Sequence, residues 1–323
     1  MITAYAKTNG SLAARRLDDG TAIPADALWL DLFEPTRAEE KAVEAALGIA
    51  IPSREDMQEI EISSRLYAEN GASFMIATLM AQADTDNPVS APVTFVLTGG
   101  RLVTLRYIDP TPFQLYAAQL GKGGHGITSG EAAFAGLMDA IIDRLADILE
   151  RVQRDVDMLS RLIFAPPQAG KKTDFRTILR RIGRNEELTA RVRDSLASIS
   201  RVLSFASRPS DNAKADKTIG RSYKTLLRDA ASLSDYAGFL SNSIYFLLDA
   251  TLGMINIEQN IIIKIFSVAA VVFLPPTLIA SIYGMNFEFM PELDSPFGYP
   301  AALGLMVLSV ILTFTYFKRR GWL

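Results

Sequence analysis

Residues suited to handling a metal ion gather in one short segment near the end of this 323-residue chain. The segment begins with Gly284, Met285 and Asn286 and continues with three carboxylates, those of Glu288, Glu292 and Asp294. Mg²⁺ gives up its water reluctantly, so a neutral amide oxygen suits a hydrated ion that must bind and then leave. Carboxylates nearby would raise the local cation concentration. Two plainer interpretations stay open: an ordinary helix end, with glycine allowing a tight turn, and a solvated acidic loop.

Composition narrows the chemistry to oxygen ligands. The chain has no cysteine, which excludes disulfides and thiolate-bound zinc or iron–sulfur sites. Its one histidine, His125, lies in a glycine-rich stretch and is expected to be solvated. The net charge of −3 argues against nucleic-acid binding. We find no phosphate-binding loop and no nucleophile motif with a histidine partner, so no enzyme, catalytic residue or cofactor is expected.

Two uncharged apolar runs, Ile265–Tyr283 and Phe297–Phe317, flank the segment. Each is about as long as the roughly 20 residues that cross a bilayer as a helix. Lys264 precedes the first run and residues 318–320 are all basic, whereas the loop between the runs carries only acids. The positive-inside rule then places the loop outside and both termini in the cytoplasm. The start of the chain lacks the apolar core of a signal peptide, so we expect the soluble part to stay in the cytoplasm and the chain to span a membrane twice.

One face of the first run has the pattern of a pore lining. Stepping back from Asn286 at the helical period gives a set with polar residues at its ends and apolar residues between: Asn260, Ile263, Phe266, Leu274, Thr277 and Ser281. The polar members would bind hydrated ions, and the apolar members would close the pore by dewetting. Alternatively, the two hydroxyls bond to their own helix. Pro275 and Pro276 remove two backbone donors, which predicts either a bend or exposed carbonyls.

The elements before this site read as three parts. Residues 1–125 predict a mixed α/β domain, with a capping box at Thr36–Glu39 opening a helix through Leu47. A buried strand is expected at 73–81, and a hairpin at 93–97 and 102–105. Residues 126–220 predict a helical hairpin, with helices at about 131–164 and 173–206. Residues 221–283 predict a stalk helix that continues into the first span, followed by a loop at 284–296 and the second span with its basic tail at 297–323.

The stalk carries a seam of residues spaced alternately four and three apart: Leu226, Ala230, Leu233, Ala237, Leu240, Ile244, Leu247, Thr251 and Met254. This spacing is typical of coiled coils. A continuous helix over 221–283 would be about 90 Å long, too long for one chain to cover, so we expect a parallel oligomer. The alternative is a set of shorter helices broken near Gly220 and Gly253.

The sequence resembles the CorA magnesium transporters, bacterial branch. The likeness rests on Tyr283-Gly-Met-Asn-Phe-Glu288 joined to Met290-Pro-Glu-Leu293, on residues 256–260, and more weakly on 29–32 and 100–106. It implies an α+β multi-pass protein of the bacterial inner membrane: a homopentameric funnel with a cytosolic α/β/α domain, stalk helices, and first spans lining the pore. It implies that Gly284, Met285 and Asn286 form the selectivity filter, with Asn260 a pore amide near the cytosol.

The resemblance also implies transport of Mg²⁺, with Co²⁺ and Ni²⁺ as further substrates, and closure by intracellular Mg²⁺ bound between cytosolic domains. The acid expected on the stalk falls near Thr225, so Asp229 and Asp235 are the nearest candidates, with Asp84 and Asp86 as partners. One alternative function is zinc transport of the related ZntB type. Another, from a different class, is a membrane-anchored cytosolic scaffold.

Overall fold

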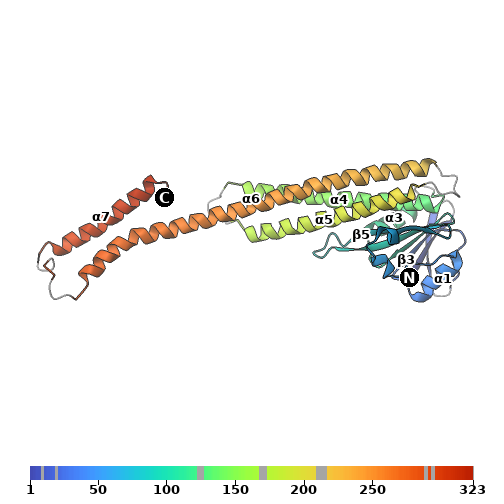
Figure 1. Ribbon diagram of the computed structural model, residues 1–323, viewed down its shortest axis with the longest axis horizontal. Coiled ribbons are helices and arrows are strands. Elements are labelled where there is room, and N and C mark those ends of the chain that lie inside the picture. Colours follow the sequence, from blue (N-terminus) through green and yellow to red (C-terminus); the bar gives the residue numbers. More distant parts are fainter. Residues whose placement is uncertain are drawn as a thin grey trace. The chain divides into compact units, whose positions relative to one another are not determined.

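The chain folds into two compact units, residues 1–248 and residues 249–323. The structure is a computed structural model that describes residues 1–8, 11–18, 21–121, 127–166, 173–208, 217–286, 290–291 and 295–322. One element, the 67-residue helix α6 (Lys217–Tyr283), runs from the first unit into the second (Figure 1). The expectation of one unbroken helix is confirmed, and the alternative of breaks at Gly220 and Gly253 is wrong.

A seven-stranded mixed sheet forms the base of the first unit, in the order β2-β1-β3-β7-β6-β5-β4. Among the strands that the structure describes, only β3 and β7 pair in parallel. The strands are β1 (Ile2–Thr8), β2 (Ser11–Leu17), β3 (Ala27–Phe33), β4 (Leu66–Glu69), β5 (Ala72–Ala81), β6 (Val89–Thr98) and β7 (Arg101–Arg106). The expected strand and hairpin are confirmed. Gly99 and Gly100 close the hairpin with φ of 54° and 72°, the conformation that a two-residue turn between twisted strands requires.

Alternation along β3 divides the two faces of the sheet. Leu30 and Leu32 pack with Val43 of α1 (Arg37–Leu47), beside the short helices η1 (Asp56–Gln58) and α2 (Ile62–Arg65). Trp29 points the other way and lies 5.8 Å from Tyr116 of α3 (Thr111–Gly121), centroid to centroid. Since strand side chains alternate in direction, both faces are covered and three layers result. The predicted capping box of α1 is present.

Two long helices cover the second face of the sheet: α4 (Gly130–Phe164) and α5 (Phe175–Ala206). The ring of Phe134 on α4 meets Phe95 of β6 edge-on at 5.6 Å. On α5, the Ser198 hydroxyl accepts a hydrogen bond from the Thr78 amide at 3.0 Å. The helical hairpin predicted from the sequence therefore packs on the sheet through its own apolar and polar contacts.

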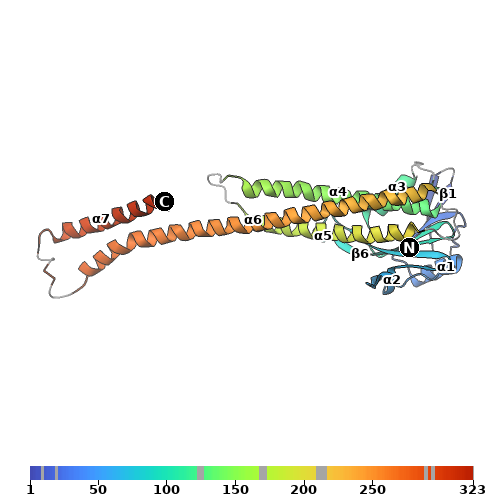
Figure 2. The same cartoon turned by 45° about the horizontal axis from the view of Figure 1, so that its top comes forward.

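The first part of α6 packs against this hairpin within the same chain. Figures 1 and 2 both show α4, α5 and this part of α6 side by side. The Tyr223 ring meets Phe134 at 5.8 Å, and the Ser241 hydroxyl donates to the Glu186 carboxylate at 2.9 Å. Seam residues such as Ala230 and Leu240 are fully buried. Between Leu226 and Leu247 the seam is therefore covered by α4 and α5 of the same chain, and the expected parallel oligomer stays a prediction.

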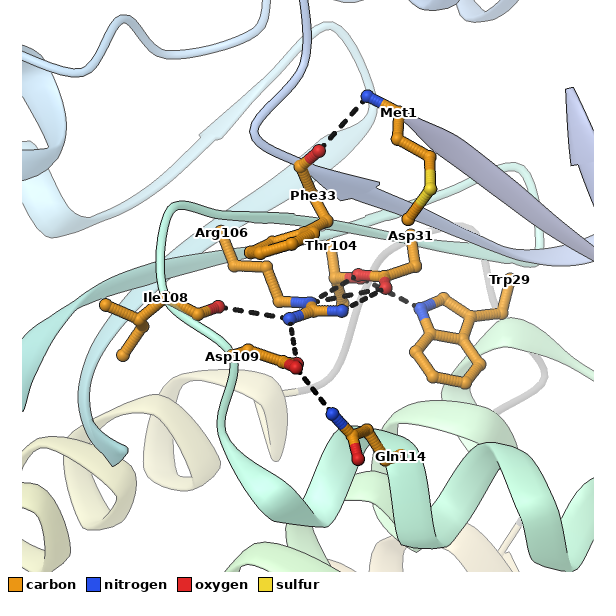
Figure 3. Close-up of polar contacts among 9 residues, drawn as sticks. All are labelled: Met1, Trp29, Asp31, Phe33, Thr104, Arg106, Ile108, Asp109 and Gln114. Atoms are coloured by element: carbon orange, nitrogen blue, oxygen red, sulfur yellow. Dashed lines mark hydrogen bonds and ion pairs between the residues drawn. The ribbon is translucent and has the colours of Figure 1, made fainter. Parts of the chain in front are cut away.

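A buried ion pair links the two parallel strands β3 and β7 (Figure 3). The Arg106 guanidinium binds Asp31 through two nitrogens, with Nη2 2.9 Å from Oδ2. Thr104 donates to Asp31 at 2.7 Å, and the Trp29 indole donates to Thr104 at 2.9 Å. Arg106 also donates to Asp109 at 2.6 Å. Because both charges are buried and their hydrogen bonds satisfied, the network fixes the register of β3 on β7.

The second unit consists of the end of α6 and the helix α7 (Gly298–Arg319), which runs back alongside it. Both helices are long and apolar enough to cross a membrane, and only 6 % of the residues in the most apolar stretch of each are buried. The core helix of a soluble protein would instead be covered on most sides. The α6 helix continues through Pro275 and Pro276, so the prolines do not end it.

Candidate functional site

The six residues expected to line a pore lie on one exposed face of α6. At 100° per residue, positions 260, 263, 266, 274, 277 and 281 fall within an arc of roughly 120°. The apolar members are open to the surroundings: Ile263 is 61 %, Phe266 71 % and Leu274 70 % exposed. A face that is apolar in its middle and bare in the single chain fits contact with a shared axis or with lipid. Its role as a pore lining stays a prediction.

Thr277 uses its hydroxyl within its own helix. Its Oγ1 donates to the carbonyl of Phe273 at 2.7 Å. The sequence left this intrahelical bond and an ion-facing hydroxyl as alternatives, and the structure has the first. The oxygen keeps lone pairs that accept from a water molecule around an ion. Pro275 and Pro276 cannot donate to the carbonyls of Val271 and Val272, so these two carbonyls lack their usual helical donors.

Gly284 ends α6 for a reason other than the expected one. It does not adopt the left-handed conformation that many terminal glycines use. Its amide donates to the Ala280 carbonyl at 3.0 Å, and a Cβ at this position would lie only 3.0 Å from the same oxygen. A close approach of backbone to backbone therefore favours glycine here. Met285 and Asn286 follow directly, and both are exposed.

Several predicted residues lie outside the part of the chain that the structure describes. These are the three acids expected at the outer mouth, Glu288, Glu292 and Asp294, and the single histidine, His125. Asn286 is the last described residue before the gap that contains Glu288. The structure thus places an amide just beyond the end of α6, whereas the acidic mouth remains a prediction from the sequence.

Two of the four acids proposed to hold a regulatory ion form ion pairs with arginines of the same chain. Asp84 pairs with Arg144 at 2.5 Å and with Arg151, and Asp86 pairs with Arg184 at 2.7 Å. Hydrogen bonding from Arg151 holds the pKa of the Asp84 carboxyl below its usual value. The loop after β5 is in this way tied to α4 and α5. A cation at Asp84 would have to compete with two guanidinium groups.

The stalk acids have different surroundings. Asp229 and Asp235 are exposed, and Asp229 lies close enough to Asp139 of α4 to affect its ionisation. Burial, together with Asp143 and Asp229, raises the pKa of Asp139. Asp139 and Asp143 line a groove of about 1020 Å³ between α3, α4 and α6. The sequence suggested Asp84 as a partner of Asp229 and did not indicate Asp139. Only the packing of α4 on α6 brings Asp139 and Asp229 together.

No group of three or more histidine, aspartate or glutamate side chains is placed to hold one ion, among the residues that the structure describes. The four proposed regulatory acids are thus spread over the first unit. Asp84 and Asp86 follow β5, whereas Asp229 and Asp235 are on α6.

Known proteins of related sequence identify the family. A family model described as a CorA-like Mg²⁺ transporter protein matches residues 24–319. The chain belongs to the CorA family. The magnesium transport protein CorA of Yersinia pseudotuberculosis is 35 % identical over 325 residues, which cover 100 % of both chains. The predicted family is confirmed, and magnesium transport is the activity after which these relatives are named.

Solved structures show the same fold. The complete CorA magnesium transporter of Methanocaldococcus jannaschii matches with a TM-score of 0.78 at 19 % identity, over 100 % of this chain and 99 % of that one. The ZntB cytoplasmic domain of Vibrio parahaemolyticus matches with a TM-score of 0.57 at 8 % identity, over 79 % of this chain and 97 % of that one. The predicted CorA-type fold is confirmed: a soluble α/β domain, then a long helix whose C-terminal part is apolar, followed by a second apolar helix.

Proposed function

We propose that the chain is one subunit of a channel for Mg²⁺ uptake in the bacterial inner membrane, with both termini cytoplasmic. The observation that carries the proposal is Asn286, an exposed amide placed by Gly284 at the end of a bare apolar helix. Several copies around one axis would offer a ring of neutral oxygens to a hydrated ion. Gly284, Met285 and Asn286 then form the selectivity filter, and the face from Asn260 to Ser281 lines the pore.

The assembly we propose is a homopentamer. The bare surfaces of both apolar helices support contacts with lipid and with other copies of the chain. Membership of the CorA family supports a symmetric transporter. The stalk seam does not supply the interface, since α4 and α5 cover it. Contacts between subunits are therefore expected along the exposed faces of α6.

Passive transport would be sufficient for uptake. A membrane potential of 100 mV favours the inward movement of one charge by about 2.3 kcal/mol, and of a divalent ion by about 4.6 kcal/mol. No catalytic cycle is needed for this direction. The three acids of the loop would add to the inward bias by concentrating cations outside. Co²⁺ and Ni²⁺ are proposed as further substrates, because they share the charge and the oxygen-binding chemistry of Mg²⁺.

Intracellular Mg²⁺ is proposed to close the pore by binding between cytosolic domains of neighbouring subunits. The exposure of Asp229 and Asp235 supports their role as ligands shared with another copy. Asp84 and Asp86 are weaker candidates than the sequence indicated, because arginines already bind them.

Replacing Asn286 by alanine tests the filter. The change removes the amide oxygens and is expected to abolish Mg²⁺ influx into proteoliposomes while the oligomer keeps its native mass. Asn242→Ala is the matched control, since Asn242 is also an exposed asparagine of α6 but lies in the first unit. Normal influx through Asn286→Ala would remove the filter from the proposal. Competition of Zn²⁺ against Mg²⁺ in the same assay separates magnesium from zinc transport.

A further inference from the structure

Four cationic residues of the second unit lie near the C-terminal end of α7. Lys318, Arg319 and Arg320 are consecutive and exposed, and Lys264 of α6 is also exposed. The Lys264 ammonium lies 6.0 Å from the centre of the Trp322 ring. Within the described residues, none of the four forms an ion pair with a carboxylate. Their charge is thus not neutralised by the parts of the chain that surround them in the structure.

A turn after α7 holds this group in place. Gly321 has φ of 70°, and the Trp322 amide donates to the Phe317 carbonyl at 3.1 Å. This left-handed helix end folds Trp322 back, so that its ring lies 5.5 Å from the buried ring of Phe317. The indole is then positioned between α7 and Lys264. Tryptophan beside cations at the end of an apolar helix is typical of the membrane interface.

An apolar groove lies between α6 and α7, farther from this end of α7. Its volume is about 220 Å³, and it is lined by Pro276, Met306, Val307, Val310 and Ile311. Ile311 and Lys318 are seven residues apart, so they share a face of α7 and lie about 10 Å from each other along its axis. An acyl chain whose headgroup sits at Lys318 would therefore run past Ile311 into the groove.

We propose that residues 249–323 carry a binding site for an anionic phospholipid. The phosphate lies among Lys264, Lys318 and the two arginines, which donate charge-assisted hydrogen bonds to its oxygens. Trp322 packs beside the glycerol region, and one acyl chain occupies the groove between α6 and α7. The site rests on the proposed membrane topology, and it goes beyond ion transport because none of its residues belongs to the filter.

Lipid retention tests the headgroup part. The purified oligomer in a neutral detergent is mixed with equal amounts of phosphatidylglycerol and phosphatidylcholine of matched chains, and native mass spectrometry counts the lipids retained. We expect preferential retention of phosphatidylglycerol. Arg319→Gln with Arg320→Gln should weaken it about thirtyfold, since each cation near an anionic surface contributes roughly a factor of five. Lys264 and Lys318 are kept to preserve the orientation of the spans.

Arg193→Gln with Arg201→Gln is the matched control, because it removes two exposed charges of α5 in the first unit. This variant should retain phosphatidylglycerol like the unchanged protein. Equal retention of the two lipids, or an equal loss in both double variants, would overturn the site. The assay involves no flux, so its failure leaves the filter untouched, and a failure of the Asn286 test leaves this site untouched.

A second variant tests the groove. Val310→Phe fills the space with a larger side chain and should reduce retention of long-chain phosphatidylglycerol several-fold. Retention of the dihexanoyl lipid, whose chains are too short to reach the groove, should not change. Loss of both lipids, or of neither, would contradict the placement of the acyl chain.

Discussion

Two phenylalanines show how differently the two units are built. Phe134 in the first unit is fully buried against the sheet and α6, whereas Phe266 in the second unit is 71 % exposed. The first unit completes its core within one chain. The second unit leaves its apolar surface bare, so it needs lipid or other copies of the chain. The difference shows that the first unit of this chain is finished by itself, whereas the second unit is unfinished.

Charges follow the same division. Each ion pair that the structure describes lies in the first unit, among them the buried pair of Asp31 and Arg106. In the second unit, Lys264 and Arg320 contact aromatic rings instead. Cations that face rings rather than carboxylates stay available for an anionic partner, which is why we assign them a phospholipid.

We expect the largest effect from a substitution that breaks the network of Asp31 and Arg106 in the first unit. Arg106→Met leaves Asp31 buried without its partner and should lower the free energy of unfolding by about 3–5 kcal/mol. The loss of bonds to Asp109 and Ile108 favours the upper end. Thermal unfolding in detergent measures the change. Adding Asp31→Leu should recover much of the loss. A double variant no more stable than Arg106→Met would show that packing, not the unpaired charge, was responsible.

The two phenylalanines themselves give the sharpest test of the comparison. Phe134→Ala should destabilise the first unit by about 3 kcal/mol or more, because it leaves a cavity in a packed core. Phe266→Ala removes the same atoms from an exposed position and should leave the unfolding of the first unit unchanged. If it lines the pore, Mg²⁺ flux through this variant will differ. Equal destabilisation by both changes would contradict the division into a finished and an unfinished unit.

Replacing glycines of the helical hairpin by alanine should change the free energy of unfolding by a smaller amount. A Cβ on Gly130 would lie 2.2 Å from the backbone carbon of Arg101, so Gly130→Ala must shift α4 away from β7. We expect a loss of about 1–3 kcal/mol in the free energy of unfolding. Gly183 on α5 has open space at this point, and Gly183→Ala should be neutral or slightly stabilising. Chemical denaturation of both variants compares them directly, and equal stability would count against the close approach.

The smallest effect depends on pH. Burial and two neighbouring acids raise the pKa of Asp139, so the folded protein holds this proton more tightly than the unfolded chain does. The charged form therefore destabilises the fold at neutral pH, but not below about pH 4, where both states are protonated. Asp139→Asn should raise the stability at pH 7 by at most about 1 kcal/mol, since solvent screens the group. A gain that persisted at pH 3.5, or that Asp194→Asn reproduced, would contradict this origin.

Local signals predicted the elements well. The capping box at Thr36, the glycine pair at 99–100 and the long apolar periods each depend on neighbours close in sequence. The seam of α6 did not predict its own partner, because a spacing of four and three is the same whether other copies or α4 and α5 cover it. The approach of Asp229 to Asp139 and the ion pair of Asp84 with Arg151 each join residues far apart in the sequence, and no spacing rule predicts them.

The sequence by itself determined that this chain has two membrane-length helices and an amide at the end of the first, because hydrophobic length and residue type are local properties. Only the tertiary structure decided which apolar faces are already covered. It buried the stalk seam under α4 and α5 and left the face of Ile263 and Phe266 bare. The physical reason is that burial depends on what packs against a surface, and the partner of a surface is chosen by the whole fold.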